Sequence, residues 1–351
     1  MPKDTMTPRE RLLAVLNRQT PDRVPMNYTA TAEATQKLLS HLGCDHDEML
    51  RRLHIDWSVS LEGRYVGPTP PEGIDIWGCE QRPVDYGCGV YWEVVSAPLA
   101  KYNSVEEIEA NYRWPSPDDW DYSHLPSELK GKEHLPVCGG CSQPMFQYTY
   151  LRGEEQSFVD LIENPEIAHY CLDKMYDLCY QDFLRIFEAA PGAVMVTTVA
   201  DDMGGQNGLN YSPSQIREFL LPGMKRLIGL VKQHGSHVFH HNDGSIRNIL
   251  PDLIDIGIEI LNPVQWRCAG MEREGLKRDF GDKLIFHGGV DNQHTLPFGS
   301  VEDVRQEVID NLRILGEGGG YILGPCHNIQ AVGPPENVVA LYETGYEYGW
   351  T

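Results

Sequence analysis

Short apolar runs alternate with amphipathic stretches along most of the chain after about residue 135. Short apolar runs bounded by turn residues are typical of buried strands, and longer stretches with a period of 3.6 residues are typical of helices. The pattern predicts strands at 137–140, 193–200, 236–241, 258–261, 283–288 and 319–323, and earlier runs predict two more at 23–28 and 54–58. Such alternation of strands and helices favours a parallel sheet.

Two of the intervening stretches carry clear helix boundaries. One opens at Ser212 and Pro213 and stops before Gly235, which predicts a helix at 212–234. The other opens at Ser300 with acidic residues in its first turn, which predicts a helix at 300–315. Together the elements predict an α/β fold in which residues 1–351 form a single (β/α)8 barrel domain. A doubly wound open sheet is the alternative, although no Gly-x-Gly-x-x-Gly motif follows a first strand.

The segment at about 61–121 interrupts this rhythm. It is rich in Gly, Pro, Trp and Tyr, and it contains alternating stretches such as GVYWEVV at 89–95. We expect an insertion of short antiparallel strands and loops that caps one end of the barrel. It could serve as a lid, as a structural flap or as the surface of a homodimer, and the sequence leaves these open.

The charge balance limits the partners of the chain. Aspartate and glutamate number 51 against 29 lysines and arginines, which gives a formal net charge of -22. Nucleic-acid binding requires a basic surface, so we expect no nucleic-acid partner. No apolar run is long enough to span a bilayer, and we expect no membrane association.

The cysteines and the start of the chain indicate the compartment. Nine cysteines, an odd number, are scattered along the chain and do not resemble a disulfide framework. Residues 1–25 resemble an amphipathic helix and lack the apolar core of an export signal. We therefore expect a cytoplasmic protein with reduced thiols.

Polar residues follow several of the predicted strands at the point where each strand ends. In a barrel all these strand ends meet at one face, which is where barrel enzymes place their chemistry. The convergence predicts a site in which Asp202, His241 and Asn262 take part in catalysis. The other polar residues of this group are expected to contact substrate: Asp201, Gln206, Gln265, Asp291 and His327.

The strand at 236–241 also suggests a metal site. A period of two places His237, Phe239, His241 and Asp243 on one face of the chain, so His241 and Asp243 could hold one cation. Cys326, just after the last strand, could complete three protein ligands of a zinc site with an open position, and His327 is a possible substitute. The alternative is a hydrogen-bonded core histidine beside an inert cysteine.

A cysteine pair and an aromatic residue are further candidates for the site. Cys138 and Cys141 have the C-x-x-C spacing of metal and redox motifs, but no second pair follows, and a structural role is the simpler interpretation. Tyr148, like several other aromatic residues, could wall an apolar substrate pocket, although core packing is the usual role of such residues.

Several motifs resemble those of the uroporphyrinogen-decarboxylase-like superfamily over most of the chain. The similarity rests on TPRERLLAVL at 7–16, PDRVP at 21–25, VFHHNDG at 238–244, LPDLIDIG at 250–257, LNPVQ at 261–265, HGGVD at 287–291, GGYILGPCHNI at 319–329 and PPENV at 334–338. The resemblance implies a (β/α)8 barrel. It also implies one of two chemistries, which are decarboxylation of uroporphyrinogen and methyl transfer to or from a corrinoid protein with a bound zinc.

The methyltransferase branch fits the sequence better. The decarboxylases carry an Arg-rich N-terminal motif for their polycarboxylate substrate, whereas the corresponding stretch here is MNYTATAE at 26–33. In the zinc motif of the methyltransferases, His-x-Cys-Gly with a later Cys, His241 takes the place of the histidine, Asp243 that of the first cysteine and Cys326 that of the later one.

The resemblance therefore implies demethylation of a small methylated or methoxylated substrate, with zinc as a Lewis acid and with a corrinoid carried by a partner protein. The alternatives are a metal-free lyase that acts on a non-porphyrin carboxylic acid and a non-catalytic barrel that binds a ligand.

Overall fold

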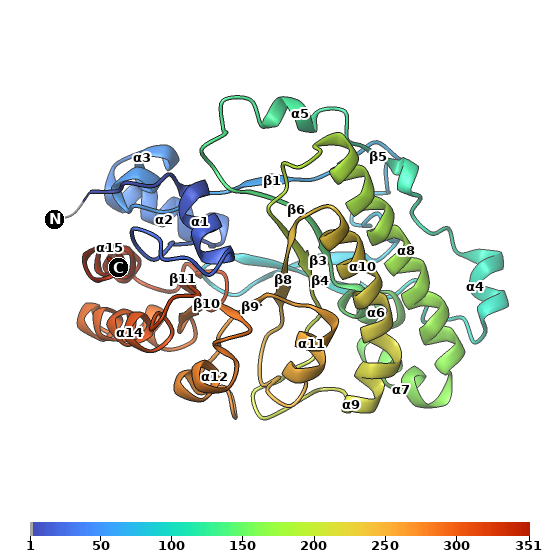
Figure 1. Ribbon diagram of the computed structural model, residues 1–351. Coiled ribbons are helices and arrows are strands. Elements are labelled where there is room, and N and C mark those ends of the chain that lie inside the picture. Colours follow the sequence, from blue (N-terminus) through green and yellow to red (C-terminus); the bar gives the residue numbers. More distant parts are fainter. Residues whose placement is uncertain (1–2) are drawn as a thin grey trace.

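Seven parallel strands form the centre of the protein in the computed structural model, which describes residues 3–351 (Figure 1). They pair in the order β1 (Val59–Leu61), β6 (Val137–Ser142), β7 (Val196–Val199), β8 (His237–His241), β9 (Ile260–Asn262), β10 (Ile285–Val290) and β11 (Tyr321–Pro325). Strands from 137 onward lie within a few residues of their predicted positions, because each apolar run supplies the buried residues of one strand.

The first predicted strand, at 23–28, is not a regular strand but closes the barrel. Met26 forms an isolated parallel bridge with Leu323 of β11, and on its other side its carbonyl accepts a hydrogen bond from the backbone N–H of Asp56. Pro25 has no N–H to donate, which limits regular pairing here. The second prediction, 54–58, lies just before the observed β1, because the segment around Asp56 bonds through its side chain and only residues 59–61 pair with β6.

Helices surround the strands as an outer layer (Figure 1). The helix predicted at 212–234 is present as a continuous run of α9, the π-helical turn η2 and α10, with Ser212 as its N-cap. The helix predicted at 300–315 is α14, with Ser300 as its N-cap. The bounds are α1 (Pro8–Leu16), α2 (Ala32–Leu42), α3 (His46–Arg52), α4 (Val105–Asn111), α5 (Leu125–Glu128), α6 (Pro144–Arg152), α7 (Glu154–Glu163), α8 (Pro165–Ala189), α9 (Pro213–Gln215), η2 (Ile216–Leu220), α10 (Leu221–Gln233), α11 (Leu250–Ile256), α12 (Arg273–Phe280), α13 (Thr295–Phe298), α14 (Val301–Ile314) and α15 (Pro335–Tyr348).

Helix α1 closes the amino-terminal end of the barrel. Its Val15 and Leu16 pack against Met195, just before β7, and against strand side chains, namely Val196, Ile260, Ile285 and Ile322. These side chains form a small core separate from the main core between the strands and the outer helices. The opposite, carboxyl end of the barrel is therefore the end that stays open for a site.

The segment between β1 and β6 forms short antiparallel elements. Strand β2 (Arg64–Tyr65) pairs with β5 (Trp120–Asp121), and β3 (Glu80–Asp85) forms a hairpin with β4 (Val90–Ser96); the short helix η1 (Pro117–Asp119) precedes β5. Near the hairpin tip, Tyr86 donates a hydrogen bond to Gln330 Oε1, and Gln330 Nε2 donates one to Tyr91. The hairpin thus reaches the loop after β11, at the carboxyl end of the barrel.

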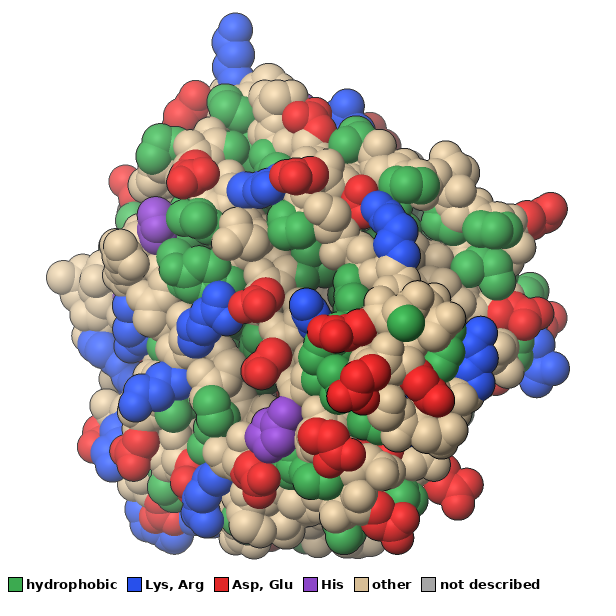
Figure 2. Space-filling model, turned by 90° about the vertical axis from the view of Figure 1, so that its right-hand side faces the viewer, with side chains coloured by type: hydrophobic (Ala, Val, Ile, Leu, Met, Phe, Trp, Pro, Cys, Tyr) green, Lys and Arg blue, Asp and Glu red, His purple; other side chains and the backbone are tan. Residues whose placement is uncertain are grey.

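The surface carries many charged side chains, and the helices are short or polar. On the face that carries α4 and α8, acidic side chains are interspersed with lysines and arginines (Figure 2). Within residues 3–351, no helix is both long enough and apolar enough to cross a membrane.

Candidate metal and substrate site

Strand β8 directs alternate side chains to opposite sides, as its sequence predicts. Val238 and His240 are buried toward the outer helices, whereas Phe239 and His241 are half-buried and line a cavity inside the barrel. His240 donates a hydrogen bond from Nδ1 to the carbonyl of Val199, and burial lowers the pKa of His240 to about 4. His240 is therefore a neutral core histidine, and His241 is the histidine that is available for chemistry.

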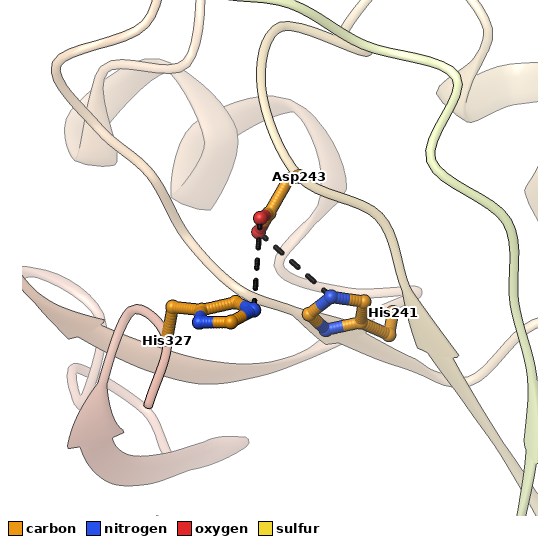
Figure 3. Close-up of side chains that lie close together, drawn as sticks. All are labelled: His241, Asp243 and His327. Carbon is orange, nitrogen blue, oxygen red and sulfur yellow. Dashed lines mark ion pairs between the residues drawn. The ribbon is translucent and has the colours of Figure 1, made fainter. Parts of the chain in front are cut away.

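His241, Asp243 and His327 converge at the carboxyl end of the barrel (Figure 3). Asp243 follows β8 and His327 follows β11, and one ligand atom from each residue lies within 4.8 Å of the others. His241 Nε2 is 3.9 Å from Asp243 Oδ1, and His327 Nε2 is 3.9 Å from Asp243 Oδ2. Among residues 3–351 this is the one group of three or more His, Cys, Asp or Glu residues with such spacing.

Asn262 fixes the orientation of the His241 ring. His241 Nδ1 donates to Asn262 Oδ1 at 2.6 Å, and Asn262 Nδ2 donates to His287 Nδ1 at 2.6 Å. Burial lowers the pKa of His287 to about 3, so His287 is a neutral acceptor. With its proton on Nδ1, His241 presents the lone pair of Nε2 toward Asp243, which is the form that a metal ligand requires. Asn262, which the sequence predicted to be catalytic, contacts His241 and fixes the position of its ring.

Two carboxylates, those of Asp202 and Asp243, lie within 4 Å of His241 Nε2. Asp202 Oδ1 accepts the backbone N–H of Asp243 at 2.9 Å and lies 3.8 Å from His241 Nε2. Asp243 Oδ1 is buried without a hydrogen-bond partner, and burial raises the pKa of Asp243. A buried carboxylate oxygen with no donor is unfavourable, and a cation between Asp243 and the two histidines would satisfy it.

Cys326, which the sequence predicted as a metal ligand, is not part of this group. Its thiol is buried and donates to the carbonyl of Val264, with 3.2 Å between Sγ and the oxygen. Burial raises the pKa of Cys326 well above its usual range, so it stays a thiol. The neighbouring residue, His327, points to the site because β11 ends at Pro325 and the chain turns there.

A cavity of about 370 Å³ extends from His241 into the barrel. Its floor is apolar and includes Leu12, Val196, Ile260 and Ile322, whereas its upper wall carries amide, hydroxyl, thiol, imidazole and carboxylate groups. Among the described residues that line it, none is a lysine or an arginine. A cavity of this size and lining suits a small molecule and lacks the cations that a polycarboxylate requires.

Most of the polar residues of this wall were missed by the sequence analysis. They come from the amino-terminal segment, from residues just before β1 and just after β6, and from inward positions of β6, β7 and β10, and the inward phase of each strand was the one available signal. They are Asn27, Thr29, Asp56, Ser58, Cys138, Cys141, Gln143, Thr198 and His287.

Four residues that the sequence proposed as substrate contacts do not line the cavity, because each holds a structural contact. Tyr148 is buried in the core and donates to Asp160, 2.7 Å away. Gln265 Oε1 accepts the N–H of Gly244, and the Gln206 side chain accepts the thiol of Cys268. Although burial opposes it, hydrogen bonds from the N–H of Gln293 and from Arg267 lower the pKa of Asp291, which anchors its own loop.

Asp201 was also proposed as a substrate contact, and it instead caps a helix. Its Oδ1 accepts the N–H of Phe146 in the first turn of α6, whose N-cap residue Gln143 makes no side-chain cap. Its Oδ2 is buried without a partner, and burial raises the pKa of Asp201 to about 8. Asp201 is therefore protonated in the folded protein at neutral pH.

This raised pKa predicts a pH-dependent stability. Between the ordinary value of 3.8 and about 8, the folded state keeps a proton on Asp201 that the unfolded state loses, so stability falls as the pH rises. Compared with Asp201→Asn, the wild-type protein should lose about 1.4 kcal/mol of unfolding free energy between pH 6 and pH 7. Urea denaturation at both pH values measures the difference. Equal pH dependence in the two proteins would show that Asp201 is ionised when folded.

The cysteine pair of β6 has a structural explanation. Between Cys138 and Cys141 the register with β7 shifts, and Gly140 adopts a φ of +80°. A Cβ atom at Gly140 would come within 2.6 Å of the Phe183 ring on α8. The two glycines therefore permit the bulge and the close packing of α8, and all nine cysteines are free thiols.

The fold and the position of the site define an α/β barrel with a small polar site at the carboxyl ends of its strands. Residues 123–348 match the family model described as uroporphyrinogen decarboxylase (URO-D). The chain belongs to this family, and the superfamily expected from the sequence motifs is confirmed.

Individual relatives are distant. Over 287 residues the chain is 27% identical to the uroporphyrinogen decarboxylase of Pseudomonas fluorescens strain Pf0-1, and the aligned region covers 76% of this chain and 75% of the relative. It is 27% identical over 292 residues to that of Pseudomonas putida strain F1, with coverage of 76% and 77%. A methyltransferase from Methanosarcina mazei has a similar structure, with a TM-score of 0.69, 22% identity and coverage of 98% of this chain and 99% of that chain. This likeness confirms the barrel fold.

Proposed function

We propose that the protein is a methyltransferase that demethylates a small methylated substrate, with a zinc ion held by His241, Asp243 and His327. The observation that carries the proposal is the convergence of these three side chains at the mouth of the barrel cavity (Figure 3). The structural likeness to a methyltransferase also supports this proposal.

The donor set suits zinc. Two imidazole nitrogens and one carboxylate oxygen are ligands that catalytic zinc sites use, with a fourth position left for water or substrate. Asn262 keeps His241 in the required tautomer, in the way that outer-shell partners orient zinc ligands. Asp243 Oδ1 is buried without a hydrogen-bond partner, so binding a cation would stabilise the carboxylate.

The zinc ion, the cavity and Asp202 would have different roles. When bound, zinc would supply Lewis-acid polarisation of the substrate heteroatom. The barrel cavity would hold the substrate away from bulk water, with its apolar floor below and Thr198 and Asn27 on the wall. Asp202, which lies 3.8 Å from His241 Nε2 and outside the cavity lining, would face the end of the substrate that is bound to the metal.

The methyl acceptor would be a corrinoid on a partner protein. The described residues, 3–351, form the barrel and its 61–121 segment, and we place the corrinoid on a separate chain. The open carboxyl end of the barrel is the route by which it would reach the substrate.

Two other functions compete with this one. A metal-free lyase would use Asp202 or His241 as a general acid on a carboxylic acid, and the family relatives that are uroporphyrinogen decarboxylases favour this alternative. The cavity lining without lysine or arginine argues against a porphyrinogen with many carboxylates. A non-catalytic barrel would bind a ligand in the cavity and convert nothing.

Elemental analysis followed by an activity screen tests the proposal. We expect about one zinc per chain after the protein is purified with zinc, and loss of that zinc in His241→Ala. We also expect cob(I)alamin to be methylated by at least one member of a panel of methoxylated and methylated compounds. The matched control is His237→Ala, because His237 lies on the same strand but pairs with Glu259. Carbon dioxide release from a carboxylic acid by the metal-free protein would establish the lyase instead.

The orientation of His241 by Asn262 has its own test. Replacing Asn262 with alanine leaves His241 Nδ1 without its acceptor, so the ring loses its fixed tautomer. We expect zinc affinity to fall about 10- to 100-fold, as for loss of other outer-shell partners. Competition with a chromogenic chelator measures the affinity. An affinity equal to that of the wild-type protein would mean that Asn262 does not position the ligand.

A further inference from the structure

A second cavity, also of about 370 Å³, lies beside the barrel cavity. It is bounded by the ends of β1 and β6, by α8 and by the segment between β1 and β6. It shares Cys138, Cys141 and Thr198 with the barrel cavity, so the two are separated by the bulge of β6. Neither the metal group nor the barrel cavity accounts for it.

The charged side chains in its lining are acidic. Glu62 follows β1, and Asp182 projects from α8 and accepts a hydrogen bond from the Tyr122 hydroxyl at 2.7 Å. None of the described residues that line it is a lysine or an arginine. Arg185, less than one turn further along α8, donates to the carbonyl of Pro117 and to Asp118, each at 2.6 Å. Burial raises the pKa of Asp182, the hydrogen bond from Tyr122 lowers it, the charge of Glu62 raises it and that of Arg185 lowers it. A cation between Asp182 and Glu62 would offset the repulsion of the two carboxylates.

Three aromatic residues contribute to the wall of this cavity. Trp77 and Trp120 are half-buried, and Tyr122 is 9% exposed. Rings of this kind attract a cation to their π faces, most strongly when the cation is shielded from water. Carboxylates and aromatic faces together are the chemistry that recognises alkylated ammonium groups.

The thiols of the lining argue against a metal ion here. Burial raises the pKa of Cys141 to about 11 and also raises that of Cys179, so a metal ion would have to displace both thiol protons. Metal ions are bound by the thiolate form. Within residues 3–351 the carboxylates and thiols of this cavity also do not form a group with the spacing of metal ligands.

We propose that this second cavity binds a small organic ammonium ion, with its charge facing Glu62 and Asp182 and its alkyl groups against Trp77, Trp120 and Tyr122. The volume is within the range of small-molecule sites. The inference stands apart from the proposed methyl transfer, because none of these five residues belongs to the metal group.

Titration with choline and with its neutral isostere 3,3-dimethylbutan-1-ol tests the charge preference. The two molecules have the same shape, and tryptophan fluorescence and calorimetry report their binding. We expect saturable binding of choline that is about tenfold or more tighter than that of the alcohol. Tetramethylammonium and dimethylammonium extend the series. Equal affinity for the alcohol, or no binding of any of the three cations, would overturn the proposal.

Variants locate the binding. Asp182→Asn keeps an acceptor for Tyr122, and Glu62→Gln alters an exposed side chain, so both proteins should fold. We expect each substitution, and Trp120→Leu, to weaken choline binding about tenfold while zinc content stays the same. Asp173→Asn is the control, since Asp173 is an exposed residue of the same helix α8. Unchanged choline affinity in all three variants, with circular dichroism as for the wild-type protein, would refute the site.

Discussion

Replacing His327 with alanine will remove zinc from the protein, whereas replacing Cys326 with alanine will leave it bound. His327 Nε2 lies 3.9 Å from the Asp243 carboxylate, while the Cys326 thiol is buried and bonded to the carbonyl of Val264. Because a direct ligand is lost, the affinity should fall by more than the roughly 10- to 100-fold expected for an outer-shell partner. Elemental analysis and chelator competition measure both variants.

The substitutions of Cys326 and His327 show which of these two residues is the third zinc ligand. The sequence resemblance assigned Cys326 to the zinc, and the structure brings His327 to His241 and Asp243 instead. His241→Ala should behave like His327→Ala, and His237→Ala like the wild-type protein. Zinc lost in Cys326→Ala but retained in His327→Ala would mean that the ligands of the resemblance are correct and that the loop after β11 rearranges.

Replacing Asp56 with alanine will destabilise the protein by about 3 to 5 kcal/mol, the range observed when one partner of a buried ion pair is removed. Asp56 bonds to both Arg11 and Arg23, and the side chains of all three are at most 5% exposed. Its Oδ2 also accepts the backbone N–H of Met26, which belongs to the segment that closes the barrel. The substitution therefore leaves two buried guanidinium groups without their shared carboxylate.

Urea denaturation measures the effect of the Asp56 substitution. A surface ion pair provides the control: Asp118, whose side chain is 84% exposed, pairs with Arg185, and Asp118→Ala should cost no more than about 1 kcal/mol. A loss of less than about 1 kcal/mol in Asp56→Ala would show that water or Asp22 compensates for the missing carboxylate.

The sequence was most informative where local chemistry decides the structure. The apolar runs placed six of the barrel strands to within a few residues, and Ser212 and Ser300 marked the starts of their helices. It was least informative at 23–28 and 54–58. There the backbone is paired through single bridges and through the side chain of Asp56, whose partners are distant in sequence.

The site residues show the same division. The phase of β8 was sufficient to direct His241 into the barrel and His240 away from it, because side chains of a strand alternate. Whether Cys326 or His327 faced Asp243 depended on how the chain turns after β11, which no local pattern encodes. Gln206, Gln265 and Asp291 were predicted as polar residues beyond strand ends and Tyr148 as an aromatic wall of the pocket, and each is engaged by a partner that folding brings to it.

By itself, the sequence determined the barrel architecture, the family, the end of the barrel that carries polar residues and the inward face of β8, because these follow from hydrophobic periodicity and from motifs within one segment. The tertiary structure alone decided which side chains meet. The group of His241, Asp243 and His327, the orientation of His241 by Asn262 and the second cavity between β6 and α8 each join segments far apart in the chain. Contacts of that kind depend on the packing of the whole barrel, and side-chain order along the chain does not specify them.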